Sequence, residues 1–191
     1  MGAAIPAATK GRMIRLFTAL SIPDDVAGTL ARRQTGLPGA RWRTADQLHI
    51  TLTFYGEVDG RRADELAVEL ERAAGGGPFE IALAGVGSFG DGHRTRTLWA
   101  GIEPNERLSI LAGRTRSAAE RAGIAVERRD YRPHLTLAYL KPHANPDRIG
   151  AWIAGHNLLH SPPIRVDRFG LYSSVLTHDG SHYELEREYL L

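Results

Sequence analysis

The stretch LHITLTFY, residues 48–55, decides the fold, and RPHLTLAYL at residues 132–140 repeats its pattern. Successive side chains of a β-strand point to opposite faces. For the first stretch this alternation predicts an apolar and a polar face: Leu48, Ile50, Leu52 and Phe54 against Gln47, His49, Thr51 and Thr53. The apolar face would anchor the strand in the core, and the polar face would hold a His-x-Thr pair rigidly.

The second stretch carries the same pair, with His134 and Thr136 on the face opposite Leu135 and Leu137. A single His-x-Thr strand is typical of a sheet with one wet face. Here the triplet recurs after 85 positions, at corresponding places in a weak internal repeat of strand, polar turn, helix and further strands. The recurrence indicates an active site divided between two distant parts of the chain.

Hydrophobic periodicity and capping signals predict the remaining elements. We expect strands at 13–20, 78–89, 95–103, 164–175 and 182–190, and helices within 21–34, 59–74, 105–123 and 145–156. Ser21 is the expected cap of the first helix and Asn145 that of the last. Helical spacing predicts a buried stripe in each middle helix: Ala63, Leu66, Ala67, Leu70 and Ala74 in the first, and Leu108, Leu111, Ala112, Thr115 and Ala119 in the second. Strands and helices mix without strict βαβ alternation, which favours an α+β fold with mainly antiparallel sheets. We expect outer helices and two lobes related by an approximate two-fold axis, in a single domain over 13–191 after a disordered tail at 1–12.

Composition narrows the function classes. The 191 residues carry a net charge of only +2, which does not by itself argue for tight polyanion binding. Only Lys10 and Lys141 are lysines, so the other Lys and Arg residues are arginines. The planar guanidinium group of arginine suits phosphate binding, but genome-wide codon bias gives the same excess of arginine. The absence of cysteine excludes disulfides, zinc–thiolate sites and thiol nucleophiles. No membrane segment or signal peptide is recognisable, so we expect a cytoplasmic protein.

Two histidines and two threonines suit one kind of chemistry. Because the unperturbed pKa of histidine is about 6.5, one imidazole can take a proton from an attacking oxygen while the other gives one to a leaving oxygen. Threonine hydroxyls beside them can donate hydrogen bonds to the non-bridging oxygens of a phosphate. The set therefore favours cleavage of a phosphodiester without metal or cofactor.

At this point the chain resembles a known family. HITL and HLTL look like the paired His-x-Thr-x motifs of the 2H phosphoesterase superfamily, and the surrounding sequence is similar to its RNA 2',3'-cyclic phosphodiesterase branch, also called 2'-5' RNA ligases. IRLFTAL, LHITLTFYGEV, TLWAGI, YRPHLTLAYL and VDRFGLYSS all stand in the family's order. The likeness covers nearly everything from Arg15 to the C-terminus.

The resemblance implies a two-lobed fold with a central cleft and hydrolysis of RNA 2',3'-cyclic phosphate ends, or of small cyclic nucleotides, to 2'-phosphates. His49 and His134 would be catalytic, with His134 as the base and His49 as the acid, and Thr51 and Thr136 would bind phosphate. Phe17 matches an aromatic position near the nucleoside; a core phenylalanine is the other interpretation. No metal or cofactor is expected, and a monomer suffices.

One departure concerns a cation. Family members often carry arginine three residues after the second threonine, where this chain has Tyr139. Alternation would turn Tyr139 toward the apolar face. Arg132, beside His134, or Lys141 could supply the positive charge instead, and Arg132 is our candidate for binding substrate.

Other motifs give weaker signals. GVGSFG at 85–90 fits the dinucleotide fingerprint, but a polar turn and a strand follow it where a helix is required, so we interpret the glycines as a turn or bulge. His156 and His160 have helical metal-ligand spacing without a partner motif, which indicates chance.

The rival functions are ligation, by the same site run backwards, and a catalytically silent RNA-binding module.

Overall fold

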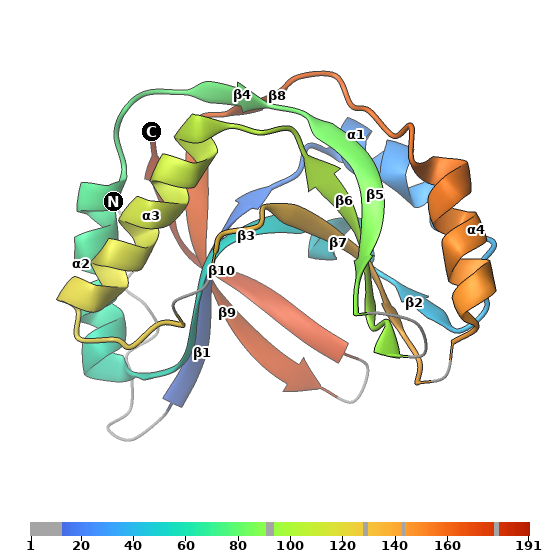
Figure 1. Cartoon of the computed structure of the whole chain (residues 1–191). Coiled ribbons are helices and arrows are strands. Elements are labelled where there is room, and N and C mark those ends of the chain that lie inside the picture. Colours follow the sequence, from blue (N-terminus) through green and yellow to red (C-terminus); the bar gives the residue numbers. More distant parts are fainter. Residues whose placement is uncertain (1–12, 91–93, 128–129, 143, 178–179) are drawn as a thin grey trace.

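The computed structural model describes residues 13–90, 94–127, 130–142, 144–177 and 180–191 (Figure 1). The tail expected at 1–12 lies outside these residues. Figure 1 shows two halves, each with strands backed by helices. The first half contains β1 (Met13–Ser21), β3 (His49–Asp59), α2 (Gly60–Ala73), α3 (Glu106–Arg121), β9 (Arg168–Thr177) and β10 (Gly180–Leu190).

The second half lies on the other side of the molecule (Figure 1). It contains α1 (Asp24–Ala31), β2 (Ala40–Trp42), the short 3₁₀ helix η1 (Ala45–Gln47), β5 (Leu83–Phe89), β6 (Thr97–Ile102), β7 (His134–Leu140) and α4 (Pro146–His156). A separate pair of short strands, β4 (Phe79–Ile81) and β8 (Ile164–Val166), lies where segments of the two halves meet.

The strands of both halves join in one antiparallel sheet. Their order is β10-β9-β1-β3-β7-β6-β5, and β2 also pairs with β7. Among the described residues, β3 and β7 meet in a single pair, Ile50 opposite Leu135. The predicted α+β class with antiparallel pairing is thus confirmed, and the two halves meet at the two motif strands.

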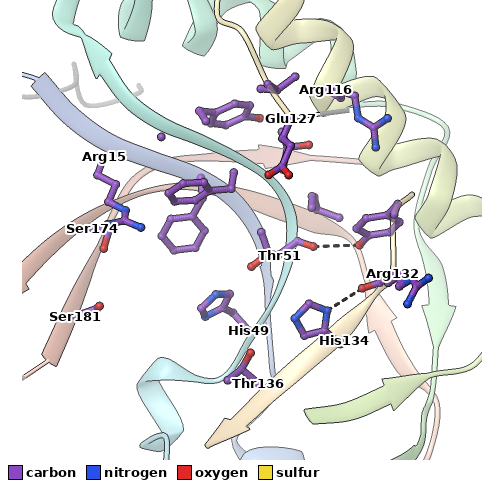
Figure 2. A pocket seen from close by; sticks show the side chains of 18 of the residues that line it. Arg15, His49, Thr51, Arg116, Glu127, Arg132, His134, Thr136, Ser174 and Ser181 are labelled. Carbon is purple, nitrogen blue, oxygen red and sulfur yellow. Dashed lines mark hydrogen bonds between the residues drawn. The ribbon is translucent and has the colours of Figure 1, made fainter. Parts of the chain in front are cut away.

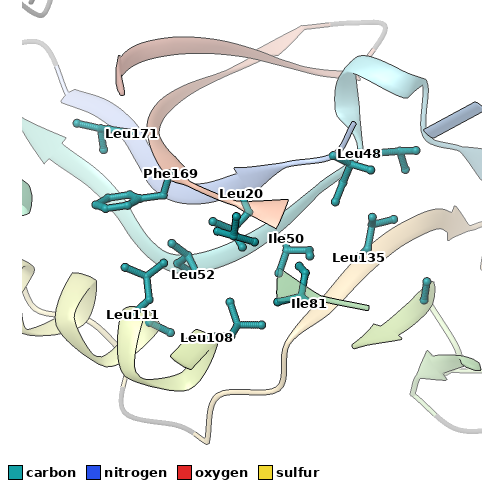
Figure 3. Packing of buried hydrophobic residues seen from close by; sticks show 14 of the residues in the cluster. Leu20, Leu48, Ile50, Leu52, Ile81, Leu108, Leu111, Leu135, Phe169 and Leu171 are labelled. Atoms are coloured by element: carbon teal, nitrogen blue, oxygen red, sulfur yellow. The ribbon is translucent and has the colours of Figure 1, made fainter. Parts of the chain in front are cut away.

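The core lies under these strands. Ile50 of β3 and Leu135 of β7 are completely buried. Figure 3 shows them in a cluster that reaches Leu108 and Leu111 on α3. Burial of this apolar face fixes the two strands, and therefore fixes the polar residues that alternate with it.

The helices follow their predicted stripes, with two corrections. In α3 the predicted inward residues are all buried: Leu108, Leu111, Ala112, Thr115 and Ala119. In α2, Ala73 and not Ala74 ends the buried stripe, because the helix stops at Ala73. The cap predicted at Asn145 is confirmed: its side chain accepts hydrogen bonds from the backbone of Asp147 and Arg148. Ser21 caps nothing, because it is the last residue of β1 and pairs with His49.

The strands also differ in detail from the predictions. The expected strand 78–89 is split at Ala82, so that β4 pairs with β8 while β5 pairs with β6. Neither β2 nor η1 was predicted; each spans three residues, too few for a periodic signal. Within the described parts of the chain, every helix is too short or too polar to cross a membrane.

Candidate active site

The crossing of β3 and β7 brings the two motifs together. Because the strands are antiparallel and Ile50 lies opposite Leu135, one step along each sets His49 opposite Thr136 and His134 opposite Thr51. Figure 2 shows this arrangement, with the two imidazoles on the same side of the strands. Diagonal neighbours on such a pair have Cα atoms roughly 7–8 Å apart, a span that a single phosphate can fill. Two residues 85 positions apart thus share one site.

Each imidazole is oriented in the same way. His49 Nδ1 lies 2.9 Å from the carbonyl oxygen of Gln47, and His134 Nδ1 lies 2.7 Å from that of Arg132. A carbonyl oxygen only accepts, so each Nδ1 carries the hydrogen and donates it. In each neutral ring Nε2 is then the atom that can accept a proton.

A cavity of about 1020 Å³ contains both motifs. His49, Thr51, His134 and Thr136 all line it. Tyr131, on the segment before β7, donates a hydrogen bond of 3.1 Å to the carbonyl oxygen of Thr51 and so fixes one wall. The cavity is far larger than one phosphate needs, and it leaves room for a nucleotide.

Matching β-bulges change the faces that alternation predicted. In β3 the register with β1 slips at Leu52, and in β7 the register with β6 slips at Leu137. The two leucines hold the same place in the repeat. An extra residue reverses the alternation beyond it, so the prediction was wrong for the residues that follow each bulge.

Thr53 and Phe54 show the effect in β3. Thr53 is buried, and its hydroxyl lies 2.8 Å from that of Thr115 on α3. Phe54, predicted for the apolar face, is 46% exposed and lines the cavity. The bulge thus turns the Thr53 hydroxyl toward α3, although the residue still borders the cavity, and it exposes an aromatic ring to the cavity.

Tyr139 is the equivalent residue in β7. It was predicted to face the core, but it is 39% exposed and lines the cavity. The bulge at Leu137 turns Ala138 inward and Tyr139 outward. A side chain at this position therefore reaches the cavity because of the bulge.

The environment of His49 lowers its pKa to about 4, chiefly because burial penalises the charged imidazolium. The positive charges of Arg43 and of a protonated His134 act in the same direction, and the hydrogen bond to Gln47 opposes them. His49 is therefore neutral at pH 7 in the unliganded protein.

Phe17 lines the cavity but is only 4% exposed. Its ring packs 5.1 Å from the imidazole of His49 and also contacts Tyr172 and Tyr183. So little free surface suits support of His49 better than stacking on a nucleoside.

The candidate cations differ in whether they line the cavity. Arg132 is exposed at the cavity wall, and Lys141 is exposed and does not line it. Sequence reasoning missed Arg43, which lines the cavity and is 6% exposed. The only signal was its place just before the first motif, where its direction depends on the unpredicted strand β2.

Two other motifs are explained by the structure. Gly85 and Gly87 belong to β5, where the register slips beside Gly85 at a φ of 68°, and Gly90 follows the strand; the slip confirms the bulge in the predicted turn or bulge. His156 contacts the carbonyl of Trp152 within α4, and His160 contacts Glu103. These two rings have different partners, and the described residues include no cluster of three potential metal ligands.

Comparison with known proteins identifies the family. Residues 22–177 match the model of the 2'-5' RNA ligase superfamily, so the chain belongs to this superfamily of 2H phosphoesterases. A relative from Thermotoga maritima, named RNA 2',3'-cyclic phosphodiesterase, is 35% identical over 150 residues, which are 77% of each chain. One of the same name from Methanothermobacter thermautotrophicus is 30% identical over 175 residues, covering 89% of this chain and 95% of its own.

Solved structures agree with this assignment. TT0787 of Thermus thermophilus superposes with a TM-score of 0.76 at 27% identity, over 93% of this chain and 97% of its own. LigT of E. coli in its apo form gives a TM-score of 0.74 at 26% identity, over 96% and 99%. The fold predicted from the two motif strands is that of these proteins.

Proposed function

We propose that this protein is an RNA 2',3'-cyclic phosphodiesterase that hydrolyses cyclic phosphate ends to 2'-phosphates by two-histidine acid–base catalysis without metal. The observation that carries the proposal is the symmetric pair of imidazoles. Each has Nδ1 fixed by a carbonyl, and each lies opposite the other motif's threonine across one strand pair. The names of the relatives support the substrate class.

In the proposed reaction, Nε2 of His134 takes a proton from water, and the water oxygen attacks phosphorus. The bond from phosphorus to the ribose O3' breaks as His49 gives O3' a proton, which leaves the phosphate on O2'. Thr51 and Thr136 donate hydrogen bonds to the non-bridging oxygens, whose charge shifts in the transition state.

His49 can serve as the acid only if substrate raises its pKa. In the unliganded protein this pKa is about 4, whereas an acid active near pH 7 needs a higher value. A phosphodiester carries one negative charge, and its arrival beside the ring favours the imidazolium. Binding of substrate would therefore raise the pKa of His49, so that the ring carries the proton that the reaction needs.

The direct test is incubation with a 2',3'-cyclic-ended oligonucleotide, with and without EDTA, and identification of the product by ³¹P NMR. We expect turnover that EDTA leaves unchanged and a 2'-phosphate product. A 3'-phosphate would contradict the choice of leaving oxygen. A wild-type protein that binds the RNA but leaves the cyclic end intact would favour the binding-module alternative.

Ligation uses the same groups in reverse, with a 5'-hydroxyl in place of water. Abundant water favours hydrolysis as the net outcome, so we do not propose ligation as the main activity. We also propose that the protein is cytoplasmic and that it is a monomer. Light scattering tests the oligomeric state: a mass near 20.9 kDa is expected, and a stable dimer would contradict the monomer.

A further inference from the structure

Arg43 is a buried cation at the edge of the proposed active site. It follows β2 directly, and its backbone N–H donates to the carbonyl of Leu137, the bulged residue of β7. The side chain is 6% exposed, yet it lines the same cavity as His49 and His134. A buried charge of this kind requires a partner.

The partners that Arg43 has are aromatic. Its guanidinium carbon lies 5.5 Å from the ring of Tyr139 and 5.5 Å from the ring of Tyr183. Its Nη2 donates a hydrogen bond of 2.9 Å to the hydroxyl of Tyr183. Within the described residues no carboxylate forms an ion pair with it. Most of its N–H donors are therefore left for a ligand.

Arg43 is also close to the proposed reaction. The ring of Tyr183 that it contacts also packs 5.1 Å from the imidazole of His49. The charge of Arg43 lowers the pKa of His49, so one acts on the other across the cavity. Its guanidinium therefore lies beside His49, in the wall of the cavity that an anion between the two histidines would enter.

We propose that Arg43 binds the reacting phosphate, in place of the cation that the sequence led us to expect at Arg132 or Lys141. The inference rests on the proposed function. The guanidinium would donate to one of the two non-bridging oxygens, which Thr51 and Thr136 also contact in the proposed mechanism. Once its charge is compensated by the phosphate, Arg43 opposes protonation of His49 less strongly, which helps His49 to become the acid.

The alternative is that Arg43 only braces the protein, by stacking between a strand of each half. A brace would affect folding but not the affinity for anions. Binding of inorganic phosphate, measured by calorimetry, separates the two roles and needs no turnover.

We expect Arg43→Gln to weaken phosphate binding by about ten- to a hundredfold, the range for a charged hydrogen bond, and to raise KM for a cyclic-ended dinucleotide. Arg43→Lys, which keeps the charge but not the fork, should recover part of the loss. The matched control is Arg41→Gln. Arg41 is an exposed arginine two residues away that contacts Tyr139 but does not line the cavity, and its loss should change binding less than twofold.

Phosphate binding by Arg43→Gln equal to that of wild type or of Arg41→Gln would overturn the inference. Should Arg43→Gln fail to fold, ¹⁵N NMR of the arginine side chains in the wild type decides: the Arg43 resonance must move on addition of phosphate, and a static resonance overturns the proposal. If phosphate binding depends on Arg43 but cyclic ends are not hydrolysed, the proposed function fails, and only the binding of phosphate by Arg43 stands. If cyclic ends are hydrolysed without any dependence on Arg43, the proposed function stands and this inference fails.

Discussion

At the residue scale, His49 lies in an environment that disfavours protonation of its imidazole. Phe17 and Tyr183 pack against its ring, and Arg43 adds a positive charge nearby. These surroundings lower its pKa to about 4. The free protein therefore holds a neutral imidazole where the proposed mechanism needs an imidazolium, and the charge of the substrate must supply the difference.

This shift couples folding to pH. The unfolded chain binds a proton at His49 below its ordinary pKa of about 6.5, whereas the folded protein binds it only below about 4. The folded state therefore has its full stability, as far as His49 is concerned, above pH 6.5. It loses free energy of unfolding as the pH falls from 6.5 to 4, because only the unfolded chain takes up the proton there. Because the ring is partly open to the cavity, we expect about 1–2 kcal/mol, less than the full shift would give.

The measurement is the free energy of unfolding from urea titrations at several pH values, for wild type and His49→Gln. Between pH 6.5 and 4 the wild type should lose about 1–2 kcal/mol more than the variant. An NMR titration of the His49 ring in the folded wild type gives an independent check. A midpoint at or above 6.5 would contradict the account.

At the element scale, the sequence predicted the features that follow from local periodicity and capping. The stripes of α2 and α3, the cap at Asn145 and the two His-x-Thr strands all follow from local patterns. Strict alternation failed beyond Leu52 and Leu137, because a bulge depends on pairing with a neighbouring strand and leaves no clear mark in the strand itself. Aromatic residues at the same place after both motifs, Phe54 and Tyr139, were the available hint.

The same limit explains the missed part of the site. Arg43 follows a strand of three residues that exists only because it pairs with β7. The position of Tyr183, on β10, depends on tertiary contacts with Arg43 and Phe17. The sequence alone predicted the two motif strands. Arg43 and Tyr183, which also line the cavity, could be identified only from the three-dimensional structure.

At the scale of the whole molecule, the two halves share one sheet and one buried core, which includes residues of both. We therefore expect residues 13–191 to unfold as a single domain. The tryptophans offer a test, because Trp42, Trp99 and Trp152 all lie in the second half. Their fluorescence reports that half alone, while far-UV circular dichroism reports both.

Urea unfolding followed by the two signals should give coincident curves with one midpoint. Among the described residues, β3 of one half and β7 of the other share only the ladder pair of Ile50 and Leu135, so strand pairing alone does not guarantee that the two curves coincide. A fluorescence transition displaced from the circular dichroism transition would mean that the halves unfold separately.

The central proposal at this scale is that each half supplies one histidine to a single phosphorus atom, because the shared sheet places His49 of β3 beside His134 of β7. The most direct measurement is kcat for a cyclic-ended dinucleotide with wild type, His49→Ala, His134→Ala and the double variant, each first shown to be folded. We expect each single variant to lose about 10²-fold or more, and the double variant to lose much less than the product of the two, because the pair acts as a unit. A folded single variant that turns over substrate at the wild-type rate would contradict the claim.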